Sequence, residues 1–188
     1  MPFIVVYDAC VLYPAPLRDL LVRLGRTGLC QVKWTQRILE ECFHGILKQR
    51  PDLRPEQLAH TRSALERALS DVEVTGYEEL VEGITGLPDP DDRHVVAAAV
   101  RAGAQVIVTS NLKDFPHRVL ARYAMEAQSP DDFVLDLLDL DADALLRVLR
   151  AQAAVLKSPP RSPSEVLDSL QRNGLIHSTG RLRALLDD

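Results

Sequence analysis

Apolar residues form two kinds of pattern along this chain: short continuous runs, and stripes at helical spacing. The runs at residues 3–7 (FIVVY) and 105–109 (QVIVT) are rich in β-branched residues. Such runs are typical of strands buried on both faces, as in a parallel sheet. Residues 31–34 and 123–128 predict two more short strands, and helical stripes lie over residues 17–24, 39–47, 54–70 and 92–102. This alternation predicts an α/β fold with a central, mostly parallel sheet.

The pattern becomes wholly helical from about Asp131. Residues 133–140 and 142–156 predict two helices, and two shorter helical pieces follow a proline-rich break at residues 157–163. We therefore expect an α/β domain over residues 1–135 and a helical C-terminal extension over residues 136–188, with a separable last part. No basic patch is expected in that last part, because acidic residues offset its arginines: Arg161, Arg172, Arg181 and Arg183 against Glu165, Asp168, Asp187 and Asp188.

Composition and charge limit the classes of function. Of the 188 residues, 46% are hydrophobic, so a sizeable core is expected. The three cysteines are scattered, which disfavours a disulfide framework or a zinc site and favours a reducing compartment. With no recognisable signal peptide or membrane-spanning run, we expect a cytoplasmic protein and no membrane partner. The net charge of −5 argues against a passive nucleic-acid binder, but less against a nuclease whose acidic site recruits cations.

Two aspartates stand where an α/β fold places ligand-binding groups. Asp8 ends the first buried strand, and ligands bind at the carboxyl ends of parallel strands. At about 100° per residue, Asp92 falls near the middle of the apolar stripe that continues from Val95, so it should point inward. Each has a plainer explanation: Asp8 could cap the following turn, and Asp92 could favour the helix dipole.

The other candidates are weaker individually. Asn111 and Asp114 follow the second buried strand, at the same sheet edge as Asp8, whereas Glu40 and Glu41 lie on the polar side of a helical stripe. The five histidines form no zinc-hydrolase pair, and neither a glycine-rich phosphate loop nor a serine elbow is found. What remains is a set of carboxylates and one amide, which suit Mg²⁺ or Mn²⁺ and phosphodiester cleavage.

Four short segments together resemble the motifs of the PIN-domain family, and within it the VapC-type toxin nucleases. Residues 4–12 (IVVYDACVL) are similar to the first motif, although Ala9 and Cys10 replace its common Ser/Thr and Asn. Residues 35–41 (TQRILEE) are similar to the second motif, whose register selects Glu41 over Glu40. Residues 89–99 and 108–115 are similar to the third and fourth motifs.

The resemblance, over about residues 2–134, implies a three-layer PIN-like fold and a Mg²⁺-dependent endoribonuclease, with Mn²⁺ as the other cation. It implies metal ligation by Asp8, Glu41, Asp92 and Asp114, with Asn111 joining them as a catalytic residue. It also implies an RNA substrate, an antitoxin partner in a type II toxin–antitoxin pair and, as in many members, a homodimer. The C-terminal extension would then serve dimerisation or antitoxin capture, unless it only covers the core.

Other hypotheses stay open on the sequence. The chain could be a free-standing RNA-processing nuclease, which a search for a neighbouring antitoxin reading frame would distinguish from a toxin. It could also be a non-catalytic PIN scaffold for RNA or protein, although a scaffold has no need to keep mutually repelling carboxylates. A phosphatase or a flap-type DNA nuclease is a more distant alternative.

Overall fold

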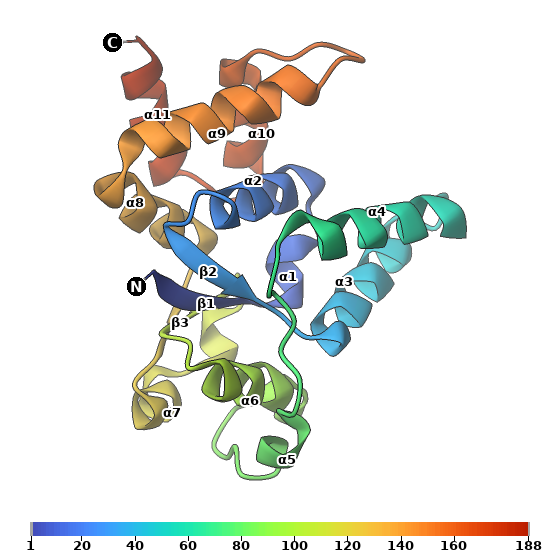
Figure 1. The fold of residues 1–188 in the computed structure, drawn as a ribbon, viewed down its shortest axis with the longest axis vertical. Helices are drawn as coiled ribbons and strands as arrows, with labels where there is room; N and C mark the ends of the chain where they lie inside the picture. Colours follow the sequence, from blue (N-terminus) through green and yellow to red (C-terminus); the bar gives the residue numbers. More distant parts are fainter. Residues whose placement is uncertain (1, 188) are drawn as a thin grey trace.

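The computed structural model describes residues 2–187 and has a four-stranded sheet at its centre (Figure 1). The strands lie in the order β2-β1-β3-β4. Their bounds are β1 (Phe3–Tyr7), β2 (Cys30–Lys33), β3 (Val106–Val108) and β4 (Glu126–Gln128). Each strand pairs in parallel with its neighbours, so the α/β class and the mostly parallel sheet are confirmed. The carboxyl ends of β1 and β3 consequently lie side by side.

Helices cover both faces of the sheet and form the outer layers. One face carries α2 (Ala15–Gly25), and the other carries α6 (Arg93–Ala102) with α5 (Glu78–Val81) and α7 (His117–Leu120) (Figure 1). The helices α1 (Ala9–Leu12) and α3 (Gln36–Gln49) follow β1 and β2, and α4 (Pro55–Ala68) comes after α3. Three 3₁₀ turns are η1 (Pro90–Asp92), η2 (Leu112–Asp114) and η3 (Ala121–Tyr123). None of the helices within residues 2–187 is long and apolar enough to cross a membrane.

Local capping explains where several elements begin and end. The Thr35 hydroxyl accepts the N–H of Ile38 at the start of α3, and Gly103, with φ of 66°, ends α6. The last strand is shorter than the sequence predicts, because η3 occupies the beginning of the expected range. The next helix, α8 (Pro130–Leu140), begins earlier than predicted, because Ser129 caps it and a proline fills its first position.

The C-terminal helices pack onto α2 and are continuous with the core. They are α8, α9 (Ala142–Val155), α10 (Pro163–Arg172) and α11 (His177–Asp187). Leu167, Leu170 and Leu175 are fully buried in the same hydrophobic cluster as the strands. The helices after the break at residues 157–163 therefore share one hydrophobic core with the sheet, and a separable last part stays a prediction. The boundary expected after residue 135 falls inside α8.

One aspartate attaches the last helix to the rest of the fold. Asp131, at the start of α8, accepts the backbone N–H groups of His177 and Ser178, each at 2.8 Å. Its Oδ1 also accepts the Ser178 hydroxyl at 2.6 Å. Burial alone would raise the pKa of Asp131, but these hydrogen bonds outweigh it and hold the pKa below the ordinary value. Asp131 thus fixes the N-terminal end of α11.

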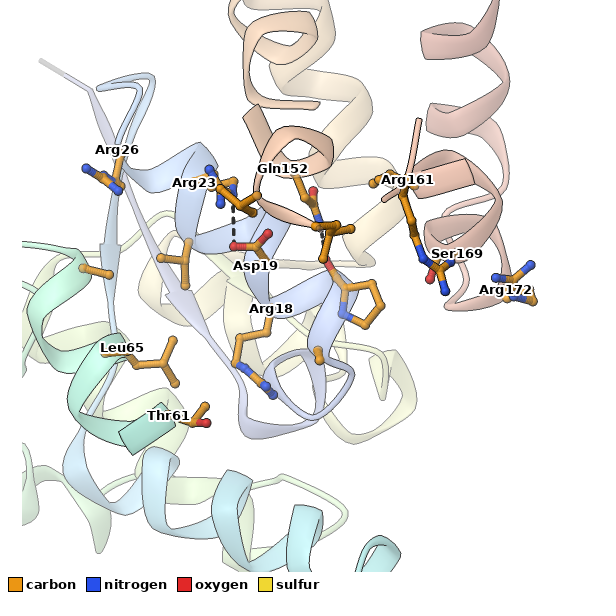
Figure 2. A pocket seen from close by; sticks show the side chains of 18 residues that line it. Arg18, Asp19, Arg23, Arg26, Thr61, Leu65, Gln152, Arg161, Ser169 and Arg172 are labelled. Atoms are coloured by element: carbon orange, nitrogen blue, oxygen red, sulfur yellow. Dashed lines mark hydrogen bonds and ion pairs between the residues drawn. The ribbon is translucent and has the colours of Figure 1, made fainter. Parts of the chain in front are cut away.

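A cleft of about 680 Å³ lies between α2, α4, α9 and α10 (Figure 2). Its lining combines apolar side chains such as Leu65 and Val166 with arginines from both parts of the chain. The arginines are Arg18 and Arg23 of α2 and Arg26 just after it, together with Arg161 and Arg172. Acidic neighbours in the sequence were expected to offset all the arginines of the last part. Arg181 forms an ion pair with Asp139 and Arg183 forms one with Asp168, so the expected absence of a basic patch in the last part stays a prediction.

Candidate active site

Asp8 lies where the ends of β1 and β3 meet. Its backbone N–H donates to the carbonyl of Val108 at 3.1 Å, and its side chain is buried. Oδ1 accepts the backbone N–H of Ala9 at 2.7 Å and so caps α1, whereas Oδ2 accepts the hydroxyl of Thr109 at 2.8 Å. Both carboxylate oxygens are held by donors, and Oδ1, which accepts only one of them, keeps lone-pair capacity for a further partner.

Thr109 and Cys10, which their sequence positions did not mark as site residues, orient Asp8. The Cys10 thiol lies 3.1 Å from Oδ2 of Asp8 and accepts the backbone N–H of Ser110 at 3.3 Å. Burial, followed by the charge of Asp8, raises the pKa of Cys10 to about 12, so the thiol stays protonated and can donate. Cys10 is therefore no nucleophile here, and it supplies a donor where the family has a polar side chain.

Glu41 is brought to the site by α3 and contacts α6. Its Oε1 lies 3.0 Å from Nε2 of His94 and 3.1 Å from Nε of Arg37. Partial burial would raise the pKa of Glu41, but the contacts with His94 and then Arg37 more than offset this, and the pKa lies below its usual value. Glu40 is exposed, in agreement with the register that selects its neighbour.

Asp92 ends η1 and leads into α6. It is half-buried, whereas Asp91 is exposed, as the inward orientation predicts. Burial, followed by the charges of Asp8, Asp89, Asp114 and Glu41, raises the pKa of Asp92 to about 7. Four acidic side chains thus lie close enough to Asp92 to disfavour its ionisation. One of them, Asp89, accepts the N–H of Asp91 at 2.9 Å and caps η1, which is the role predicted for it.

The loop after β3 contributes unequally. Asp114, at the end of η2, is half-buried and belongs to the acidic group around Asp92. Asn111 is exposed, and its side chain makes no hydrogen bond to any residue that the structure describes. Its backbone N–H does donate to the Thr109 hydroxyl at 3.0 Å. The charges of Asp8, Glu41 and Asp114 therefore all act on Asp92, whereas the exposed side chain of Asn111 has no hydrogen-bond partner among the residues that the structure describes.

The cluster has the donor chemistry of a hydrated hard cation. Between residues 2 and 187, no three acidic, histidine or cysteine side chains already enclose a point where a metal ion would touch all of them. Mg²⁺ commonly keeps several waters and takes only one or two carboxylates directly, so it does not require such an enclosure. The carboxylate donors, and the repulsion that raises the pKa of Asp92, fit a cation of this kind.

His94 is a further residue at this site that the sequence did not single out. Zinc chemistry offered no reason to select it, because His94 has no second histidine at a zinc-binding spacing. The signal in the sequence was its position directly before five apolar residues, 95–99. A helix that is apolar on all sides is buried, so a histidine at its start is expected to be buried as well. A lone histidine in such a helix needs a polar partner, and the structure supplies Glu41.

Two protein families and one known protein match parts of this chain. The family described as PIN domain matches residues 4–113, and the family described as VapC50 C-terminal domain matches residues 130–184. A Mycobacterium tuberculosis protein provisionally named ribonuclease VapC50 is 44% identical over 95 residues. That similarity covers 50% of this chain and 55% of the relative. No solved structure matches the chain.

Proposed function

The chain belongs to the PIN-domain family, and on that premise we propose that it is a metal-dependent endoribonuclease that acts as the toxin of a type II toxin–antitoxin pair. The observation that carries the proposal is the gathering of Asp8, Glu41, Asp114 and Asp92 at one end of the sheet, with the pKa of Asp92 raised. The VapC50-type C-terminal match and the similar ribonuclease-named protein support the toxin assignment.

Asp8, Asp92, Asp114 and Glu41 would hold the cation, which we propose to be Mg²⁺, with Mn²⁺ able to replace it. Bound there, it would supply positive charge to the scissile phosphate and lower the pKa of a water molecule. Asp8 is already oriented for this task, because the Thr109 hydroxyl and the Ala9 N–H fix its two oxygens. Contact with His94 holds Glu41 in its ionised, ligating form. We assign Asn111 to the substrate side of the site, where its exposed amide can reach RNA.

The proposed partners follow from the same premise. An antitoxin protein would bind the toxin, and a homodimer is the proposed assembly, in the cytoplasm. We also propose that residues 1–135 carry the nuclease chemistry and that residues 136–188 support it. A non-catalytic scaffold is less consistent with the site. Burial and neighbouring carboxylates disfavour the ionisation of Asp92, and a protein that binds no cation gains nothing from that repulsion.

Cleavage assays with end mapping test the proposed substrate class. The purified full chain is incubated with structured RNA, single-stranded DNA and double-stranded DNA, with Mg²⁺, with Mn²⁺ or with EDTA. We expect internal cuts in RNA alone, only with a divalent cation. Equal cleavage of DNA would favour the flap-nuclease alternative, and a lack of cleavage of any substrate would favour a scaffold. Adding the product of a neighbouring small reading frame should suppress the cleavage if that product is the antitoxin.

A further inference from the structure

His94 is a buried polar side chain beside the carboxylate cluster. It is the second residue of α6, two positions after Asp92, and only 1% of it is exposed. The five residues that follow it, positions 95–99, are apolar and buried. Burying an imidazole in such surroundings costs stability unless a hydrogen bond compensates, so the contacts of His94 indicate what it does.

Only one nitrogen of the His94 ring has a partner within residues 2–187. Nε2 lies 3.0 Å from Oε1 of Glu41, on α3. Nδ1 is buried and has no hydrogen-bond partner among the described residues. Most buried side-chain polar atoms have at least one hydrogen-bond partner, so a buried nitrogen without one is unusual. The single polar contact of His94 is therefore directed at Glu41, and it links two helices that carry different sequence motifs.

Glu41 has a second partner, but that partner lies on the same helix and does not connect Glu41 to α6. Arg37 lies one turn earlier on the same helix, and its Nε is 3.1 Å from the same oxygen. Exposed ion pairs at this spacing stabilise a helix only weakly. The Arg37 side chain is 45% exposed, whereas that of His94 is 1% exposed. The contact with His94 is thus the one that connects Glu41 to α6 and hence to Asp92.

We propose that His94 is a positioning residue: it holds Glu41 of α3 beside Asp92, which precedes α6, and thereby sets the affinity of the site for its divalent cation. The proposal rests on the proposed function, because it takes Glu41 as part of the metal-binding set. Residues that orient metal ligands typically change metal affinity by roughly 10–100-fold. His94 acts through Glu41 and is not itself a ligand.

Calorimetric titration of Mn²⁺ into the full-length protein tests this positioning role. His94→Leu fills most of the space but removes the donor, so we expect Mn²⁺ to bind at least about 10-fold more weakly. The melting temperature in EDTA should stay equal to or above that of the wild type, because an apolar residue suits the buried position. Arg37→Ala is the matched control: it removes the other partner of the same oxygen and should change Mn²⁺ affinity far less.

Two further variants separate positioning from a general effect of mutation. Gln can place its amide N–H near the position of Nε2, whereas Asn reaches only near Nδ1. His94→Gln should therefore recover most of the Mn²⁺ affinity and His94→Asn should not. This pair decides the matter even if His94→Leu fails to fold. In a Glu41→Gln background, adding His94→Leu should cause no further loss, because the two changes interrupt one interaction.

Several outcomes would overturn the proposal. They are wild-type Mn²⁺ affinity in His94→Leu, equal affinities for His94→Gln and His94→Asn, and additive losses in the double variant. If the variants give any of these results but the wild-type protein cleaves RNA with Mn²⁺, the proposed function stands and only the role of His94 is refuted. Wild-type protein that neither binds Mn²⁺ nor cleaves RNA would overturn both.

Discussion

Asp8 combines a structural and a chemical role in one side chain. Oδ1 caps α1, and Oδ2 is held by Thr109, so the two explanations that the sequence left open are compatible. The position of Asp8 could be predicted because the end of a buried strand is recognisable in sequence. The contact with Thr109 could not, because the two residues are 101 positions apart and only the pairing of β1 with β3 brings them together.

The repulsion around Asp92 leads to a prediction about stability. Asp92→Asn should raise the melting temperature in EDTA at pH 8, by an amount equivalent to roughly 0.5–2 kcal/mol. The reason is that the substitution removes a carboxylate whose charged form is disfavoured by burial and by Asp8, Asp89, Asp114 and Glu41. Asp91→Asn is the control, because Asp91 is exposed. A clear loss of metal-free stability in Asp92→Asn would show that Asp92 is a structural residue.

The adjacent glutamates of α3 give a second prediction. Glu41→Gln should reduce RNA cleavage at least about 10-fold, while Glu40→Gln should leave it nearly unchanged. Glu41 contacts His94 at the cluster, whereas Glu40 is exposed. Initial rates at saturating Mg²⁺ compare the two variants. If Glu40→Gln is the more damaging change, the register of the second motif is wrong.

At the scale of elements, sequence reasoning succeeded where a pattern is long or a boundary residue is distinctive. The residues of β1 and the glycine that ends α6 were predicted correctly. The 3₁₀ turns and the four-residue helices α5 and α7 were missed, because they are too short to show a period of 3.6 residues. The role of His94 was also hidden, since it depends on how α3 and α6 pack against each other.

The attachment of α11 to α8 leads to a prediction about pH. Asp131→Asn should destabilise the protein by about 2 kcal/mol at pH 7, because it weakens charge-assisted hydrogen bonds to the start of α11. The pKa of Asp131 is lowered in the folded state, so its contribution is complete above the ordinary value of 3.8 and is lost as the pH falls through the lower folded value.

Urea unfolding of wild type and Asp131→Asn from pH 7 to pH 3 measures this difference. It should be constant near neutrality and shrink below about pH 4. Asp143→Asn serves as the control, because Asp143 is exposed and forms no ion pair within residues 2–187. A difference that grows on acidification would contradict the assignment.

At the scale of the whole molecule, the C-terminal helices cover the core. The sequence left two roles open for them, protein contact or cover, and the buried leucines of α10 and α11 show that they do provide cover. Contact with an antitoxin or a second copy remains a prediction for their outer surface. The proline-rich break at residues 157–163 could not reveal this packing, because a linker composition says nothing about what the following helices bury.

Truncation after Leu156 should therefore yield an aggregated or poorly folded protein. Removing α10 and α11 uncovers the apolar surfaces that Leu167, Leu170 and Leu175 bury, and large exposed apolar patches promote association. Light scattering and thermal unfolding measure the result. A soluble truncated protein with the melting temperature of the full chain would show that the last helices form a separable appendage after all.

The central claim is that Asp8 and its neighbours form a cation-dependent nuclease site. Single-turnover RNA cleavage by wild type and Asp8→Asn, over a titration of Mg²⁺, tests it most directly. Asn retains the ability to cap α1, so the fold should persist and can be checked by circular dichroism. We predict that wild type cleaves RNA only with Mg²⁺ and that Asp8→Asn is slower by at least about 100-fold, beyond the usual effect of residues that only orient metal ligands. Cleavage in EDTA, or cleavage by Asp8→Asn at the wild-type rate, would contradict the claim.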